Sequence, residues 1–107
     1  MKESIFMIMS PLWKVIRTEH LAESKQVFDG PCYVFSVRAT GTEQGGSTAI
    51  IYDGQGVVGV PMVTLQVPQY GNDSFTPSFP MRFDRGIYVS LGADTTLRVT
   101  IQFLSVR

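Results

Sequence analysis

The sequence predicts an all-β protein, a single small β-sandwich of roughly six to eight short antiparallel strands. Three observations lead to this prediction. Apolar and polar side chains alternate in several segments, with the period of two that gives a strand one apolar and one polar face. Turn-forming residues separate these segments at short intervals, a spacing typical of sandwiches and small barrels. The 107 residues suit one domain with a single core.

Residues 1–11 are predicted to form an N-terminal arm, and residues 12–107 the sandwich domain. The arm holds a short apolar run before Pro11, which fits either a segment laid on a neighbouring subunit or an ordinary first edge strand. The candidate contact residues of the arm are Ile5, Phe6, Met7, Ile8 and Met9. This run is shorter than the roughly 7–15 apolar residues of a secretory signal and the about 20 of a membrane helix. The protein is therefore expected in the cytoplasm that makes it, or in an assembly built there.

Residues 12–23 fit a strand or a helix. A strand is favoured, because β-branched residues lie in the middle and the later elements are predicted strands. Turns are expected at residues 23–26 and at Asp29-Gly30-Pro31. Residues 32–39 are predicted to be a strand, and its expected core face carries Tyr33, Phe35, Val37 and Ala39.

Residues 40–47 read as a polar, glycine-rich loop, and two further strands are predicted at 48–52 and 62–67. Residues 69–80 form the longest predicted irregular segment, because Pro77 and Pro80 are incompatible with a central strand. This loop is expected to cover the end of the sandwich or to contact a neighbouring subunit.

Residues 85–103 are predicted to be a β-hairpin, in which a tight turn joins two alternating strands. The expected apolar face consists of Ile87, Val89, Leu91, Leu97, Val99, Ile101 and Phe103. Because an isolated hairpin is only marginally stable in water, this face requires a second sheet to cover it.

The charge of the chain indicates assembly with other proteins. Charged residues make up 17% of the sequence, against roughly a quarter in average proteins. Such a surface predicts burial against a partner and a homo-oligomer. Nine Lys and Arg balance nine Asp and Glu without a basic run, so neither a nucleic acid nor a membrane surface is an expected partner.

The residues that carry enzyme chemistry are sparse. Cys32 is the only cysteine and His20 the only histidine, and they lie in different predicted elements. Cys32 is expected to be a buried hydrophobe, and His20 to lie on the surface or in a satisfied core position. The chain has neither a G-x-S-x-G elbow nor a P-loop. No catalytic, cofactor-binding or metal-binding residue is predicted, and the protein is expected not to be an enzyme.

Several aromatic residues are candidates for a partner contact, since exposed aromatic rings often anchor interfaces or stack on sugars. Tyr88 is the strongest candidate, because its neighbours Ile87 and Val89 take the inward face. The remaining candidates lie in the loop at 69–80 and are Tyr70, Phe75 and Phe79.

From Gly30 onward the order of motifs resembles a group of small virion proteins of tailed bacteriophages. The motifs are, in order, GPCYVFSVRATG, TEQGGS, TAIIYDG, VPMVTLQV, FPMRFDRGIYVSLG and TTLRVTIQF. The resemblance covers residues 29–103. It implies a β-sandwich or jelly-roll-like fold and a structural role on the particle, and it implies no catalytic residues.

The expected function is therefore that of a non-enzymatic virion structural protein, a decoration or cement-like subunit made in the host cytoplasm. The partners that the resemblance implies are the major capsid protein or tail and portal proteins. The alternative is a receptor- or carbohydrate-binding β module on the phage surface, suggested by the aromatic loop at 69–80 and the polar loop around Glu43.

Overall fold

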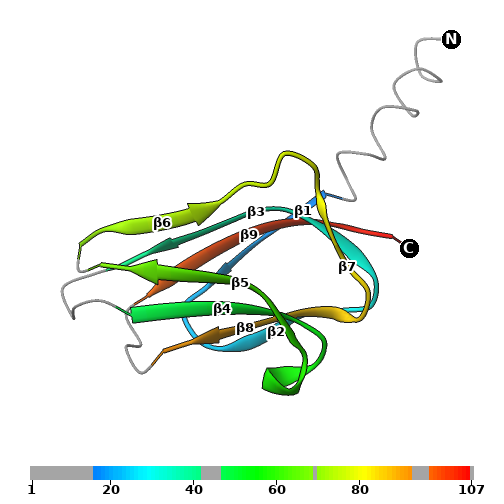
Figure 1. Cartoon of the computed structure of the whole chain (residues 1–107), viewed down its shortest axis with the longest axis horizontal. Coiled ribbons are helices and arrows are strands. Elements are labelled where there is room, and N and C mark those ends of the chain that lie inside the picture. The colour runs from blue at the N-terminus through cyan, green and yellow to red at the C-terminus, as the bar shows by residue number, and fades with distance from the viewer. Residues whose placement is uncertain (1–15, 42–46, 69, 93–96, 107) are drawn as a thin grey trace, which may run out of the picture.

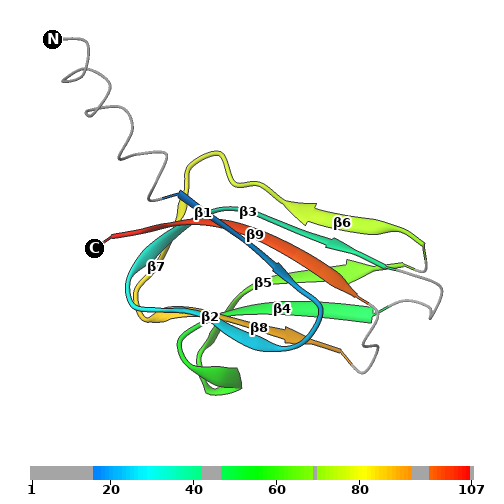
Figure 2. The ribbon, with the colours of Figure 1, turned by 180° about the vertical axis from the view of Figure 1, so that it is seen from behind.

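The protein is a sandwich of two antiparallel β-sheets, seen in a computed structural model that describes residues 16–41, 47–68, 70–92 and 97–106 (Figures 1 and 2). Sheet A has the order β1-β9-β3-β6, with β7 also paired to β3, and sheet B has the order β2-β8-β4-β5. The nine strands of these residues are β1 (Ile16–Leu21), β2 (Lys25–Asp29), β3 (Cys32–Thr40), β4 (Ser47–Asp53), β5 (Val60–Val67), β6 (Asn72–Phe75), β7 (Met81–Phe83), β8 (Gly86–Leu91) and β9 (Arg98–Ser105). A short 3-10 helix, η1 (Gly56–Val58), lies between β4 and β5.

The wiring of the two sheets is that of a jelly roll. The chain crosses from one sheet to the other at every connection except β4–β5 and β6–β7. This alternation places the C-terminal strand β9 between β1 and β3, and places β8 between β2 and β4. The predicted all-β sandwich of jelly-roll type is confirmed, with nine strands in the described residues instead of the expected six to eight.

The predicted hairpin at residues 85–103 is wrong. Both of its strands exist, but β8 pairs with β2 and β4 in sheet B, whereas β9 pairs with β1 and β3 in sheet A. Alternation reveals which side chains of a strand face the core, and it does not reveal the partner strand. The apolar faces of β8 and β9 lie in opposite sheets and contribute to the same core.

Two early elements differ in how well the sequence predicted them. The strand favoured for residues 12–23 is confirmed at Ile16–Leu21. The turn predicted at 23–26 is shorter than expected, because β2 begins at Lys25 and pairs with β8. A bulge in this pairing between Gln26 and Phe28 weakens the regular alternation by which a strand is recognised.

Strand β3 contains a β-bulge that corrects its predicted core face. Val34 lies opposite Phe103 and Ser36 lies opposite Gln102, so Phe35 is the extra residue. The alternation changes phase there: Val37 and Ala39 are buried as predicted, while Tyr33 and Phe35 are only half-buried. Their predicted places in the core are taken by Cys32 and Val34.

The segment at 69–80 is partly regular. Residues 72–75 form β6, which pairs with β3 as an edge strand, and β7 pairs with the other half of β3 after an irregular stretch at 76–80. The two prolines of this stretch therefore interrupt an edge of sheet A, where proline is tolerated.

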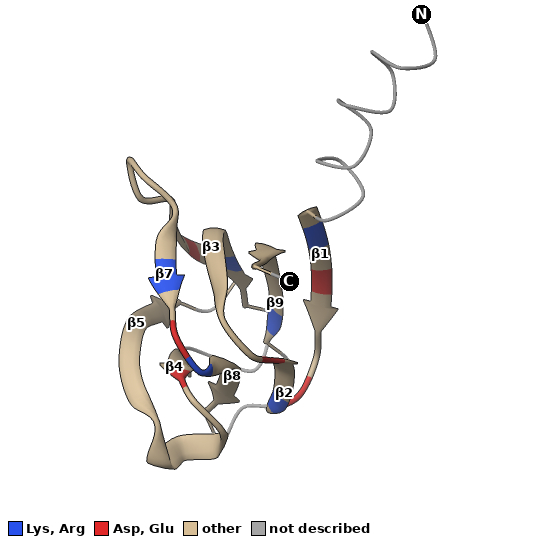
Figure 3. Cartoon of the chain, turned by 90° about the vertical axis from the view of Figure 1, so that its right-hand side faces the viewer, with Lys and Arg blue, Asp and Glu red and all other residues tan. Residues whose placement is uncertain are grey.

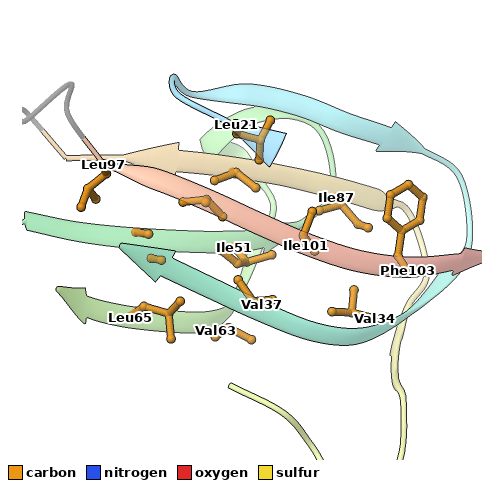
Figure 4. Close-up of a cluster of buried hydrophobic side chains, with 14 of the residues drawn as sticks. Leu21, Val34, Val37, Ile51, Val63, Leu65, Ile87, Leu97, Ile101 and Phe103 are labelled. Atoms are coloured by element: carbon orange, nitrogen blue, oxygen red, sulfur yellow. The ribbon is translucent and has the colours of Figure 1, made fainter. Parts of the chain in front are cut away.

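The core lies between the sheets and receives side chains from both (Figure 4). Leu21, Val37, Ile101 and Phe103 come from sheet A, and Ile51, Leu65 and Ile87 come from sheet B. At one open side, the Arg17 guanidinium carbon lies 5.5 Å from the ring centroid of Phe103 and 5.7 Å from that of Phe28. The positive charge of Arg17, which points inward from edge strand β1, covers this side of the sandwich. Such a charge makes it unfavourable for the edge of β1 to pair with a strand of another chain.

The predicted arm, residues 1–11, lies outside the described residues, and so do the first four residues of the predicted 12–107 domain. Among the residues that are described, no helix is long and apolar enough to cross a membrane.

Candidate interaction surfaces

The outer face of three strands of sheet B, β4, β5 and β8, is almost free of charge. Strands β4, β5 and β8 contain a single charged residue, Asp53, and this residue is buried. We call their outward side chains the neutral face; it consists of Thr48, Ile50, Tyr52, Thr64, Gln66, Tyr88 and Ser90. Charged side chains occur instead on β1, β2, β3, β6, β7 and β9 (Figure 3). Depletion of charge with tyrosines present is characteristic of the core of a protein–protein interface.

Tyr52 and Tyr88 form an aromatic pair on two neighbouring strands. They lie directly opposite each other in the β4–β8 ladder, and their ring centroids are 6.4 Å apart with an interplanar angle of 57°. Both rings are half-buried. Contact between the two tilted rings fixes the orientation of each ring. Each tyrosine keeps an edge with both apolar and polar atoms accessible to a partner.

The connection from β4 to β5 projects an apolar tip beyond sheet B (Figure 1). This valine tip consists of Val57, Val58 and Val60, whose exposed fractions are 60%, 89% and 57%. Three exposed valines within four successive positions form a cluster, unlike the scattered apolar residues that every surface carries. The tip was not among the predicted contact residues. Its signal in the sequence is GVVGVP, a turn that lacks the usual polar residues.

The base of the valine tip is held by the side chain of Gln26 from β2. Its amide nitrogen donates hydrogen bonds to the carbonyl oxygens of Gly54 (2.9 Å), Ile87 (3.0 Å) and Phe28 (3.0 Å). Its amide oxygen accepts a hydrogen bond from the main-chain nitrogen of Gly56 at 3.2 Å. One side chain thus joins β2, β8 and the start of η1, which presents the valines in one arrangement before any partner binds.

A second polar contact fixes the end of β4. The Asp53 carboxylate accepts hydrogen bonds from three consecutive main-chain amides, those of Asp84 (3.0 Å), Arg85 (2.8 Å) and Gly86 (3.3 Å). The carboxylate is buried, and these donors satisfy it in the interior. The turn that carries the chain from sheet A to sheet B is therefore tied to the strand that supports the valine tip.

The outer face of sheet A differs in character and contains a polar hollow of about 430 Å³. It is lined by His20, Ser36, Val37, Arg38, Ser74, Thr76, Thr100 and Gln102. No acidic residue is among them, and Arg38 is an exposed cation on β3.

The predicted contact residues do not form one surface. Tyr88 belongs to the neutral face. Tyr70 and Phe79 are 72% and 83% exposed, but one precedes β6 and the other follows it, so the strand separates them. Phe75 is half-buried and packs against the core. Residues 5–9 lie outside the described residues, and their role stays a prediction.

The two residues with the greatest chemical reactivity lie in different environments. Cys32 is fully buried, as predicted; burial, reinforced by the nearby negative charge of Asp53, raises the pKa of its thiol to about 11. His20 is exposed, and its Nδ1 lies 3.0 Å from the hydroxyl oxygen of Thr100. Within the described ranges, no group of three or more His, Cys, Asp and Glu side chains could hold a metal ion.

No protein-family model matches the chain, and no curated protein matches it.

Proposed function

We propose that the protein is a non-enzymatic structural subunit of a tailed-bacteriophage virion, a decoration or cement-like protein that binds a capsid, tail or portal protein. The observation that carries this proposal is the neutral face, the uncharged outer surface of three of the four strands of sheet B, which continues towards the valine tip. A soluble protein gains from such a surface when a partner covers it. The jelly-roll wiring agrees with the proposal, since viral capsid proteins use this architecture among others.

In this proposal the neutral face and the valine tip form one contact with the particle. The tip inserts exposed valines into an apolar depression of the partner, and the tyrosine pair covers the adjoining surface. Because Gln26 and Asp53 hold the tip, binding costs little loop entropy. The protein also associates with itself, and residues 5–9 contribute by adding a strand to the edge of a neighbouring subunit.

The experiment that tests the proposal measures incorporation into particles. Cells express the chain together with the other virion genes of its phage, and the purified particles are assayed for the protein by quantitative immunoblot. Val58→Asp is expected to lower incorporation about tenfold or more, because a charge placed in an apolar contact must be desolvated. The matched control is Val106→Asp, an exposed valine at the end of sheet A, which should incorporate normally.

Two results would contradict the proposal. Purified particles that contain none of the unmodified protein would reject the virion role itself. Equal incorporation of Val58→Asp and Val106→Asp would reject the valine tip as the contact.

Light scattering of the purified protein over a range of concentrations gives the number of subunits in the oligomer. Removal of residues 1–10 should leave a folded domain that no longer assembles.

A further inference from the structure

Strand register assembles the polar hollow of sheet A from four strands that are distant in the sequence. His20 on β1 lies opposite Thr100 on β9, Thr100 lies opposite Arg38 on β3, and Arg38 lies opposite Ser74 on β6. Residues directly opposite each other in a sheet share one face, and the next residues along these strands, such as Val37 and Ile101, are buried in the core. The four polar residues therefore form a row across the outer face.

A second set of polar side chains flanks this row. Ser36 donates a 3.0 Å hydrogen bond to the amide oxygen of Gln102, which fixes the orientation of the Gln102 amide. Thr76 follows β6 at the rim. The hollow of about 430 Å³ lies within the range of small-molecule sites, roughly 300–1,000 Å³.

The lining offers many hydrogen-bonding groups, and somewhat more of its surface is polar than apolar. Four of the side chains carry hydroxyl groups, each of which both donates and accepts hydrogen bonds: Ser36, Ser74, Thr76 and Thr100. In the described part of the chain, the side chains of Ser74, Thr76 and Arg38 make no hydrogen bond, so they remain available to a ligand. A ligand rich in hydroxyl groups matches this set.

The charge of the side chains that line the hollow indicates which of these hydroxyl-rich ligands it favours. The guanidinium group of Arg38 is the permanent charge of the hollow, and the lining contains neither Asp nor Glu. Asp73 is adjacent to Ser74 in sequence, but its carboxylate is engaged by the main-chain amides of Gln66 (3.0 Å) and Ser74 (2.9 Å). A guanidinium group binds a carboxylate with two parallel hydrogen bonds, so the hollow favours an anion.

We propose that the polar hollow binds an acidic saccharide, with Arg38 on the sugar carboxylate and Ser74 and Thr76 on the sugar hydroxyl groups. The site is independent of the proposed particle contact, because the hollow and the neutral face lie on the outer faces of opposite sheets. A subunit attached to a particle through sheet B would present sheet A outward, where it can meet the glycans of a cell surface.

The test uses the full chain and isothermal titration calorimetry with the methyl glycosides of glucuronic acid, galacturonic acid and N-acetylneuraminic acid. Methyl glucoside is the neutral comparison, and glucose 6-phosphate distinguishes a phosphate from a carboxylate. At least one acidic sugar is expected to bind about tenfold or more tightly than methyl glucoside, and to bind more weakly as salt is raised.

Arg38→Ala should remove this preference, lowering the affinity for the acidic sugar about tenfold, and Arg38→Lys should recover only part of it. Arg85→Ala is the matched control, since it removes an exposed arginine next to the valine tip. Thermal unfolding establishes that each variant is folded.

Four results would overturn the proposal. They are no binding of any of the three acidic sugars, equal binding of acidic and neutral sugars, tighter binding of glucose 6-phosphate, and equal effects of Arg38→Ala and Arg85→Ala. None of these results bears on incorporation into particles, which tests the other face.

Discussion

The carboxylate of Asp53 accepts a 2.8 Å hydrogen bond from the main-chain amide of Arg85, although the two residues are 32 positions apart in the chain. Asp53 ends β4 in sheet B, and Arg85 lies in the turn that leads from β7 in sheet A to β8 in sheet B. The contact therefore closes the corner of the jelly roll at which the chain changes sheets. The amides of Asp84 and Gly86 complete the binding of the same carboxylate.

Replacing Asp53 by asparagine should lower the free energy of unfolding by about 2 kcal/mol, because an amide offers one acceptor oxygen to three main-chain donors. Urea unfolding followed by circular dichroism measures the change. Asp29→Asn is the control: Asp29 is exposed and accepts a side-chain hydrogen bond from Gln55, so its loss should cost less than about 0.5 kcal/mol. Equal losses for the two variants would contradict the role given to Asp53.

Gly86→Ala should destabilise the protein by about 3 kcal/mol or more. The φ angle of Gly86 is +150°, and a Cβ atom at this position would lie 2.5 Å from the carbonyl oxygen of Phe28 in the neighbouring strand. Gly56→Ala is a matched control, since Gly56 also has a positive φ, +67°, but its Cβ would meet no atom within 4 Å. The control should lose only about 1–2 kcal/mol from backbone strain. If both variants lose a similar free energy of unfolding, the positive φ angle causes the loss and the contact with β2 does not.

The stability of the folded state should depend on Cys32 at alkaline pH. The pKa of this thiol is raised from 9.0 to about 11 in the folded protein, so between these values the thiol of the unfolded chain ionises while the folded one does not. The stability contributed by the neutral thiol is complete below pH 9 and is lost as pH rises to about 11, a change of about 2 kcal/mol.

Cys32→Ala lacks this titration. The difference in unfolding free energy between the original protein and the variant should therefore shrink from pH 8 to pH 11, which urea titrations at each pH measure. Taking the difference cancels the titration of tyrosines and lysines, which both proteins share. Parallel pH profiles would show that the thiol ionises equally in both states.

A positive charge on the neutral face should weaken the proposed contact with the particle. Thr64 is exposed and lies opposite Ile50, so Thr64→Lys is expected to fold normally. Its incorporation into purified particles, measured by quantitative immunoblot, should fall about tenfold or more. Thr40→Lys introduces the same charge on an exposed position of sheet A and should incorporate normally. The neutral face is not the particle contact if the two variants behave alike.

Arg17 should stabilise the open side of the sandwich through its position over the rings of Phe28 and Phe103. Arg17→Met keeps the apolar part of the side chain and removes the charge, and it should lower the unfolding free energy by about 0.5–1 kcal/mol. Arg17→Ala removes both and should cost more. A methionine variant as stable as the original would assign the effect to packing alone.

The sequence predicted the fold class and most strand positions, because each depends on local alternation and on turn residues. It did not predict the partners of β8 and β9, since pairing is decided by how all strands share one core. Half of the predicted core face of β3 was wrong, because Phe35 is an extra residue in the ladder. The amino-acid composition of a strand does not show where a bulge lies.

The interaction surfaces were predicted only in part, for a related reason. Tyr88 was identified because its own strand turns it outward. The row of His20, Thr100, Arg38 and Ser74 comes from four different strands. It can be predicted only when the register of these strands is already known. β6 itself was hidden by its sequence, NDSF, in which three of four residues are typical of turns.

The position of β9 at the centre of sheet A has a consequence for synthesis in the cell. Residues 16–21 and 32–40 emerge from the ribosome before residues 98–105, the strand that lies between them in sheet A. The full sheet therefore cannot form until β9 has left the ribosome, and until then β1 and one edge of β3 are expected to stay unpaired. Chaperone binding is expected in this interval, and slow codons before residue 98 should increase aggregation.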